Sequence, residues 1–113
     1  MHELSLAESA VELIEDAARR DGFARVKIVF MEIGELSCVA ADTLLVAFEH
    51  ASRDTCVAGA KVEILSVKGE GECPACGARV AMETSYDCCP HCEVIPLKVL
   101  RGTEMRVAEL EVE

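Results

Sequence analysis

Two stretches decide the fold of this chain: Cys73-Pro74-Ala75-Cys76-Gly77 and Cys89-Pro90-His91-Cys92. Each holds two cysteines separated by two residues, and 12 residues lie between the two pairs. A two-residue gap lets both sulfurs of a tight turn point at one metal ion, and two such turns complete a tetrahedron. The spacing therefore predicts a zinc ribbon whose structural zinc ion is bound by Cys73, Cys76, Cys89 and Cys92.

Two alternatives accompany this prediction. The thiols could be free or disulfide-bonded, and Cys88, directly beside Cys89, could compete for the metal. Only Cys89 keeps the two-residue gap to Cys92. The chain shows no secretory signal at Met1-His2-Glu3 and no apolar run near the ~20 residues of a membrane span. We therefore expect a cytoplasmic protein, in which paired cysteines bind metal more often than they form disulfides.

The charge balance narrows the choice of partners. The formal net charge is −10, from 21 acidic and 11 basic residues in 113. Many zinc ribbons bind nucleic acid, but such binding requires Lys and Arg that face phosphates. We expect no nucleic-acid partner and no membrane partner; an acidic protein suits cations or the basic surface of another protein.

The segments around the cysteine pairs predict helices and strands. Residues 5–21 predict a helix that begins at a Ser5/Glu8 capping box. Residues 42–53 predict a second helix, with Asp42 at its positively polarised end. Alternation of apolar and polar residues predicts three strands, at residues 24–33, 60–67 and 103–113. The apolar stripe of the first helix is expected to comprise Leu6, Ala10, Leu13, Ile14 and Ala17.

This order predicts an α+β fold, in which a small three-stranded sheet with two helices carries an inserted zinc-ribbon module. The last strand is expected at an edge of the sheet, with a bulge near Ala108. The predicted domains are a discontinuous α+β domain over residues 1–67 and 102–113 and a zinc-ribbon domain over residues 68–101. The ribbon is expected to bury almost no apolar side chains, so that the metal supplies most of its folding free energy, about 10 kcal/mol.

The cysteine site predicts no catalysis, because a closed four-thiolate zinc ion has no open coordination position. The sequence also lacks a phosphate-binding loop and a nucleophile turn, so we expect no enzyme. Cys38 and Cys56 have no partner at motif spacing and are expected to be small buried side chains. His50 is expected at the surface or half-buried, and His91 is expected to point away from the metal.

The amino terminus offers a different kind of metal site. His2 follows the initiator methionine, so the terminal amine, the amide of residue 2 and the imidazole are joined by short covalent links. Such nitrogen-rich, tetragonal geometry favours Ni²⁺ or Cu²⁺ over Zn²⁺. Glu3 adds an amide nitrogen and a carboxylate.

These motifs together resemble the HypA/HybF family of hydrogenase maturation proteins, and the resemblance covers the whole chain. The matching stretches are Met1-His2-Glu3-Leu4-Ser5-Leu6-Ala7, Ile33-Gly34-Glu35-Leu36-Ser37, Ala47-Phe48-Glu49, the two cysteine pairs and Gly102-Thr103-Glu104-Met105. The resemblance implies a nickel metallochaperone that binds Ni²⁺ through His2, with Glu3 contributing and the Met1 amine as a further nitrogen. It also implies structural zinc at the four cysteines.

The same resemblance implies partners. These are a nickel-handling GTPase maturation factor and the large subunit of [NiFe]-hydrogenase, with the chain a monomer or homodimer. The sequence does not say which hydrogenase is served, or whether urease is. Two departures from the family are Ala40, where many relatives carry an acidic residue that Asp42 would have to replace, and the additional Cys88. The alternative functions are a rubredoxin-like iron electron-transfer protein and a zinc-ribbon adaptor in transcription.

Overall fold

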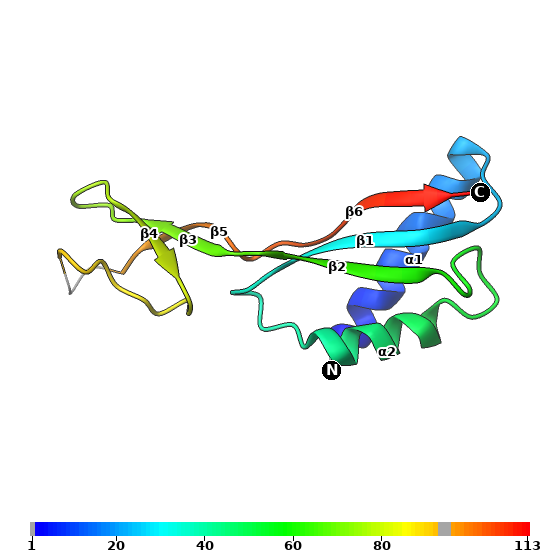
Figure 1. The fold of residues 1–113 in the computed structure, drawn as a ribbon, viewed down its shortest axis with the longest axis horizontal. Coiled ribbons are helices and arrows are strands. Elements are labelled where there is room, and N and C mark those ends of the chain that lie inside the picture. The colour runs from blue at the N-terminus through cyan, green and yellow to red at the C-terminus, as the bar shows by residue number, and fades with distance from the viewer. Residues whose placement is uncertain (1, 93–95) are drawn as a thin grey trace. The chain divides into compact units, whose positions relative to one another are not determined.

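The computed structural model describes residues 2–92 and 96–113 of the chain (Figure 1). Among these residues, no helix is both long enough and apolar enough to cross a membrane. The elements in chain order are α1 (His2–Asp21), β1 (Val26–Gly34), α2 (Ala41–Ala51), β2 (Lys61–Val67), β3 (Gly69–Glu72), β4 (Arg79–Met82), β5 (Lys98–Arg101) and β6 (Met105–Val112).

The strands form two sheets of three. The first has the order β2-β1-β6 and the second the order β4-β3-β5. In the second sheet β3 pairs antiparallel with both neighbours, and its register with β5 shifts between Glu70 and Gly71. The predicted α+β class is confirmed, and β6 lies at an edge of its sheet as predicted. No described contact tests the predicted bulge near Ala108.

The chain separates into two compact units. The first comprises Met1–Met31, Val39–Leu65 and Arg106–Glu113, and the second comprises Glu32–Cys38 and Ser66–Met105. The segment Glu32–Cys38, which precedes α2 in the sequence, thus packs with the cysteine module. The predicted division into domains, residues 1–67 with 102–113 and residues 68–101, stays a prediction.

Helix α1 begins earlier than the capping box predicted. It starts at His2, and Ser5 lies inside it as an exposed residue, so the predicted start at Ser5 is wrong. The reason is tertiary packing, because Glu3 and Ala7, one turn apart, are both buried and extend the buried stripe to the first turn. The predicted stripe is also rotated in part, since Leu13 is 59% exposed. The buried apolar residues of α1 are Ala7, Ala10, Val11, Ile14 and Ala18.

Helix α2 packs against α1 within the first unit. It buries Leu44, Ala47 and Phe48, and Asp42 lies in its first turn as predicted. No side chain caps it, because the residue before it is Ala40. Strand β1, at the centre of the sheet, completes this core with Val26, Val29 and Met31.

The second unit has a small apolar core of its own, which corrects the expectation that the ribbon buries almost nothing. Leu36, Met82 and Leu97 are buried together with two of the cysteines, Cys73 and Cys89. Leu36 comes from the Gly34–Ser37 turn, and its N–H donates to the Gly102 carbonyl at 2.7 Å. The turn that follows β1 therefore supplies a core residue to the metal module.

Candidate metal centres

The four predicted zinc ligands lie together in the second unit. The Sγ atoms of Cys73, Cys76, Cys89 and Cys92 all lie within 4.8 Å of one another. The Cys73–Cys92 sulfurs are 3.6 Å apart and the Cys76–Cys89 sulfurs 3.7 Å apart. A tetrahedral ion with metal–sulfur bonds of ~2.3 Å requires sulfurs about 3.8 Å apart. Four sulfurs at this spacing can therefore surround one ion.

The first cysteine pair lies on the turn that joins β3 to β4. The Gly77 N–H donates to the Cys73 carbonyl at 2.8 Å, and the Cys73 N–H donates to the Ala78 carbonyl at 2.9 Å. Gly77 has φ +74°, a left-handed conformation that glycine adopts without the steric cost of a Cβ. These bonds close a tight turn that brings Cys73 and Cys76 to the same side.

Cys88 lies outside the cluster. It forms an isolated antiparallel bridge with Pro96, and its exposed thiol donates to the Tyr86 carbonyl at 3.7 Å. Cys89, the next residue, is fully buried among the other three sulfurs. Among the described residues, the geometry thus selects Cys89 over Cys88, as the two-residue gap predicted.

The charges of the cluster favour a bound cation. The backbone N–H of Cys76, followed by that of Ala75, lowers the pKa of the Cys73 thiol to about 6. The neighbouring sulfurs of Cys73 and Cys76 raise the pKa of Cys92 to about 12. Without a cation, the neighbouring sulfurs therefore oppose the ionisation of Cys92. A divalent cation lets all four sulfurs ionise, and a tetrahedral set of thiolates fits zinc or iron.

The second predicted site, at the amino terminus, is described only in part. Met1 and the His2 side chain lie outside the described structure, so nickel ligation by His2 and the Met1 amine stays a prediction. Glu3 is 5% exposed, and its Oε2 accepts a hydrogen bond of 3.2 Å from the Ala40 N–H. Glu3 thus ties the first turn of α1 to the residue that precedes α2. Asp42 is exposed in the first turn of α2.

The Glu3 carboxyl is ionised over almost the whole pH range. A hydrogen bond from the chain's amino terminus, followed by one from the Ala40 N–H, lowers the pKa of Glu3 from 4.5 to about 2. A carboxyl whose pKa is lower in the folded protein stabilises the fold above its unfolded pKa, and this stabilisation is lost as the pH falls. We therefore expect Glu3 to contribute to the loss of folding stability as the pH falls below 4.5.

We expect Glu3→Gln to make stability less dependent on pH between 4.5 and about 2, the interval over which the Glu3 stabilisation is lost. The measurement is urea unfolding by far-ultraviolet circular dichroism at several pH values, without nickel, compared with the parent protein. Acid release of metal from the cysteines affects both proteins alike and cancels in the comparison. Identical profiles would show that the Glu3 carboxylate does not stabilise the fold.

The sequence also predicted the exposure of the remaining cysteines and histidines, and the structure tests these predictions. Cys38 is exposed, with φ +61°, so its predicted burial is wrong. It follows the Gly34–Ser37 turn, and its thiol reaches only the Leu36 carbonyl, at 3.9 Å. Cys56 is half-buried, and its N–H donates to Glu15 at 3.3 Å; burial, followed by the Glu15 charge, raises its pKa. His50 and His91 are both exposed.

The fold and the four-sulfur cluster define a class: small α+β proteins that carry a zinc-ribbon-type metal module. A family model, "Hydrogenase/urease nickel incorporation, metallochaperone, hypA", matches residues 1–112 of the chain. The chain therefore belongs to the HypA family of nickel-incorporating metallochaperones. The resemblance inferred from the sequence motifs is confirmed, and the family is one of maturation factors rather than enzymes.

Individual relatives agree with this placement. The chain is 48% identical over 113 residues to the hydrogenase maturation factor HypA of Albidiferax ferrireducens, with both chains covered completely. It is 44% identical over the same length to HypA of Azotobacter chroococcum, again with full coverage of both. The solution structure of the Ni metallochaperone HypA from Helicobacter pylori matches with a TM-score of 0.74 at 29% identity, over 99% of this chain and 97% of that one.

Proposed function

We propose that this chain binds one Ni²⁺ ion at its amino terminus and delivers it for insertion into the large subunit of [NiFe]-hydrogenase. The ligands are the Met1 amine, the His2 imidazole and nearby backbone amides, with Glu3 contributing to the site. The four cysteines Cys73, Cys76, Cys89 and Cys92 hold a structural zinc ion. The partners are a nickel-handling GTPase and the hydrogenase large subunit, in the cytoplasm, with the chain a monomer or homodimer.

The proposed nickel site is supported by one observation about the start of α1. The helix begins at His2, and the buried Glu3 carboxylate accepts a hydrogen bond from the Ala40 N–H. The first N–H groups of a helix do not take part in its own ladder of hydrogen bonds, so the formation of α1 does not compete with metal ligation by the His2 amide. Deprotonation of these amides offsets the positive charge of the ion, which the helix N-terminus alone would repel. The Glu3–Ala40 hydrogen bond keeps the first turn of α1 attached to the protein.

The zinc assignment follows from the donor set. Four thiolates at tetrahedral spacing leave no open coordination position, so a bound ion there stabilises the module and is not passed on. Iron fits the same sulfurs, as in a rubredoxin-like protein, and gives a strongly coloured site. Elemental analysis of untagged protein after exposure to nickel separates these readings: we expect one zinc and one nickel per chain and no colour from iron.

We expect His2→Ala, and separately one extra residue before Met1, to weaken Ni²⁺ binding at least about 100-fold, because each removes a nitrogen ligand from the chelate. The measurement is isothermal titration of the zinc-loaded, untagged protein with Ni²⁺. Affinity should rise with pH, since amide and imidazole ligation releases protons. His50→Ala is the control, because His50 is also exposed but lies on α2. Unchanged affinity in both N-terminal variants would refute the proposed nickel site.

A further inference from the structure

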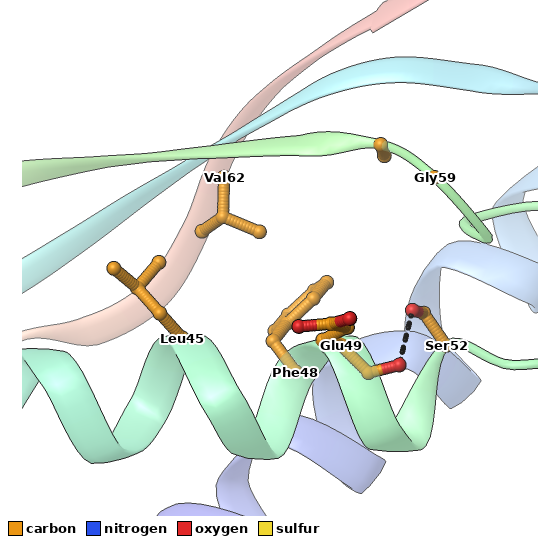
Figure 2. A pocket seen from close by; sticks show the side chains of 7 residues that line it. Leu45, Phe48, Glu49, Ser52, Gly59 and Val62 are labelled. Atoms are coloured by element: carbon orange, nitrogen blue, oxygen red, sulfur yellow. Dashed lines mark hydrogen bonds between the residues drawn. The ribbon is translucent and has the colours of Figure 1, made fainter.

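A groove of about 330 Å³ lies in the first unit between α2 and the start of β2 (Figure 2). Its apolar lining includes Leu45, Phe48, Ala60 and Val62, and Leu45 and Val62 point into it from opposite sides. Leu45 remains 39% exposed, so this surface is open to solvent. The volume is at the lower end of ligand pockets, which span ~300–1,000 Å³, and fits one or two side chains better than a cofactor.

Among the described residues that line the groove, Glu49 is the one with a charged side chain. The Ser52 hydroxyl is already occupied, because it donates to the Glu49 carbonyl at 3.0 Å. Lys61, beside the lining residues of β2, is paired with Glu63 at 2.8 Å. The Glu49 carboxylate lines the groove and has no ion-pair partner among the described residues. An occupant therefore meets an apolar surface with one uncompensated negative charge at its side.

This chemistry selects the occupant. A second copy of this chain is disfavoured, because two chains with a net charge of −10 repel each other. Complementary charge steers association and suppresses wrong partners. We propose that the groove is a docking site for a partner protein that inserts an apolar side chain against Leu45, Phe48 and Val62 and places a Lys or Arg beside Glu49. None of the residues that line the groove is a proposed metal ligand, and docking does not require nickel.

The probe is a short amidated peptide in which two leucines are flanked on each side by lysines and arginines. A second peptide, with glutamate at every basic position, is the probe control. Methyl NMR of the full-length, zinc-loaded chain without nickel reports where each peptide binds. We expect only the basic peptide to bind, and to shift the methyl signals of Leu45 and Val62.

Two variants with matched controls separate the apolar and charged contributions. We expect Leu45→Glu and Glu49→Lys each to weaken binding about tenfold or more. The controls are Leu13→Glu on α1 and Glu111→Lys on the opposite edge strand, β6, which make the same chemical changes at exposed positions outside the groove. Both controls should keep the affinity within about twofold, and zinc content and circular dichroism verify that all four variants fold.

Three results would overturn the proposal. The first is equal binding of the two peptides, and the second is binding that shifts signals at the acidic surface of α1 around Glu8, Glu12 and Glu15 instead of the groove. The third is a dimer in sedimentation velocity that Leu45→Glu dissociates, which would make a second copy of the chain the occupant. Loss of nickel binding in the His2→Ala protein would leave peptide docking unchanged, so the two proposals are tested separately.

Discussion

Cys89→Ser should abolish zinc binding and unfold the second unit. Cys89 is fully buried, and its sulfur lies 3.7 Å from that of Cys76 in the four-sulfur cluster. Structural zinc contributes on the order of 10 kcal/mol to the folding of small modules. The apolar core around Leu36, Met82 and Leu97 is too small to replace that contribution. The measurements are zinc content by elemental analysis and amide hydrogen exchange of β3, β4 and β5.

Cys88→Ser is the matched control, one residue away. Its thiol is exposed and, among the described residues, bonds to the Tyr86 carbonyl and not to the cluster, so we expect full zinc content and unchanged exchange protection. The same experiment tests the predicted division into two domains, because α1 and α2 should keep their protection in Cys89→Ser. Equal zinc loss in both variants would mean that Cys88 and Cys89 share the site.

The cysteine spacing predicted the metal cluster because a two-residue gap has few geometric solutions. Any chain that closes both turns on one ion must bring Cys73, Cys76, Cys89 and Cys92 together, whatever surrounds them. The choice of Cys89 over Cys88 followed from the same constraint, and in the structure the sulfur of Cys89 lies in the cluster. The order of α1, β1, α2, β2 and β6 was also predictable, because alternation and helical periodicity are local properties of the sequence; the short strands β3, β4 and β5 were not placed.

The errors concern tertiary packing, which local pattern does not encode. Ser5 fits a capping box, but burial of Glu3 and Ala7 extends α1 past it. Leu13 has the spacing of a core residue, yet the helix is turned so that Val11 is buried in that region instead. A shift of one position in a helix rotates a side chain by ~100°, so the phase of a stripe depends on the partner surface.

The contact least accessible from the sequence is that of Leu36. Residues Gly34–Ser37 read as a strand terminator, and nothing in their spacing points to the cysteine module. In the structure the Glu35 N–H donates to the Val67 carbonyl at 2.8 Å, and Leu36 enters the apolar core beside Cys73. The signal available beforehand was Leu36 itself, an apolar residue within a polar turn. The predicted nickel ligands at the amino terminus cannot be compared with the structure in the same way. They involve Met1 and the His2 side chain, which lie outside the described residues.

Gly34→Ala should be strongly destabilising although it leaves the metal ligands in place. A Cβ at residue 34 would lie 1.9 Å from the Gly102 carbonyl oxygen and 2.6 Å from the Thr103 nitrogen, both backbone atoms. The backbone must separate, which weakens two hydrogen bonds of 2.7 Å, from the Gly34 N–H to the Glu104 carbonyl and from the Leu36 N–H to the Gly102 carbonyl. Overpacking and two lost hydrogen bonds together predict a decrease of roughly 4 kcal/mol in the free energy of unfolding.

Gly77→Ala is the control within the same unit. Gly77 has φ +74°, and no atom lies within 4 Å of a Cβ built on it, so the substitution carries conformational strain without a clash. That strain costs about 1–2 kcal/mol. Guanidinium unfolding of the zinc-loaded variants measures both values, with zinc content verified beforehand. If Gly34→Ala lowers the free energy of unfolding no more than Gly77→Ala does, residues 34 and 102 do not approach closely in solution. The backbone hydrogen bonds that hold Leu36 in the metal module would then be absent.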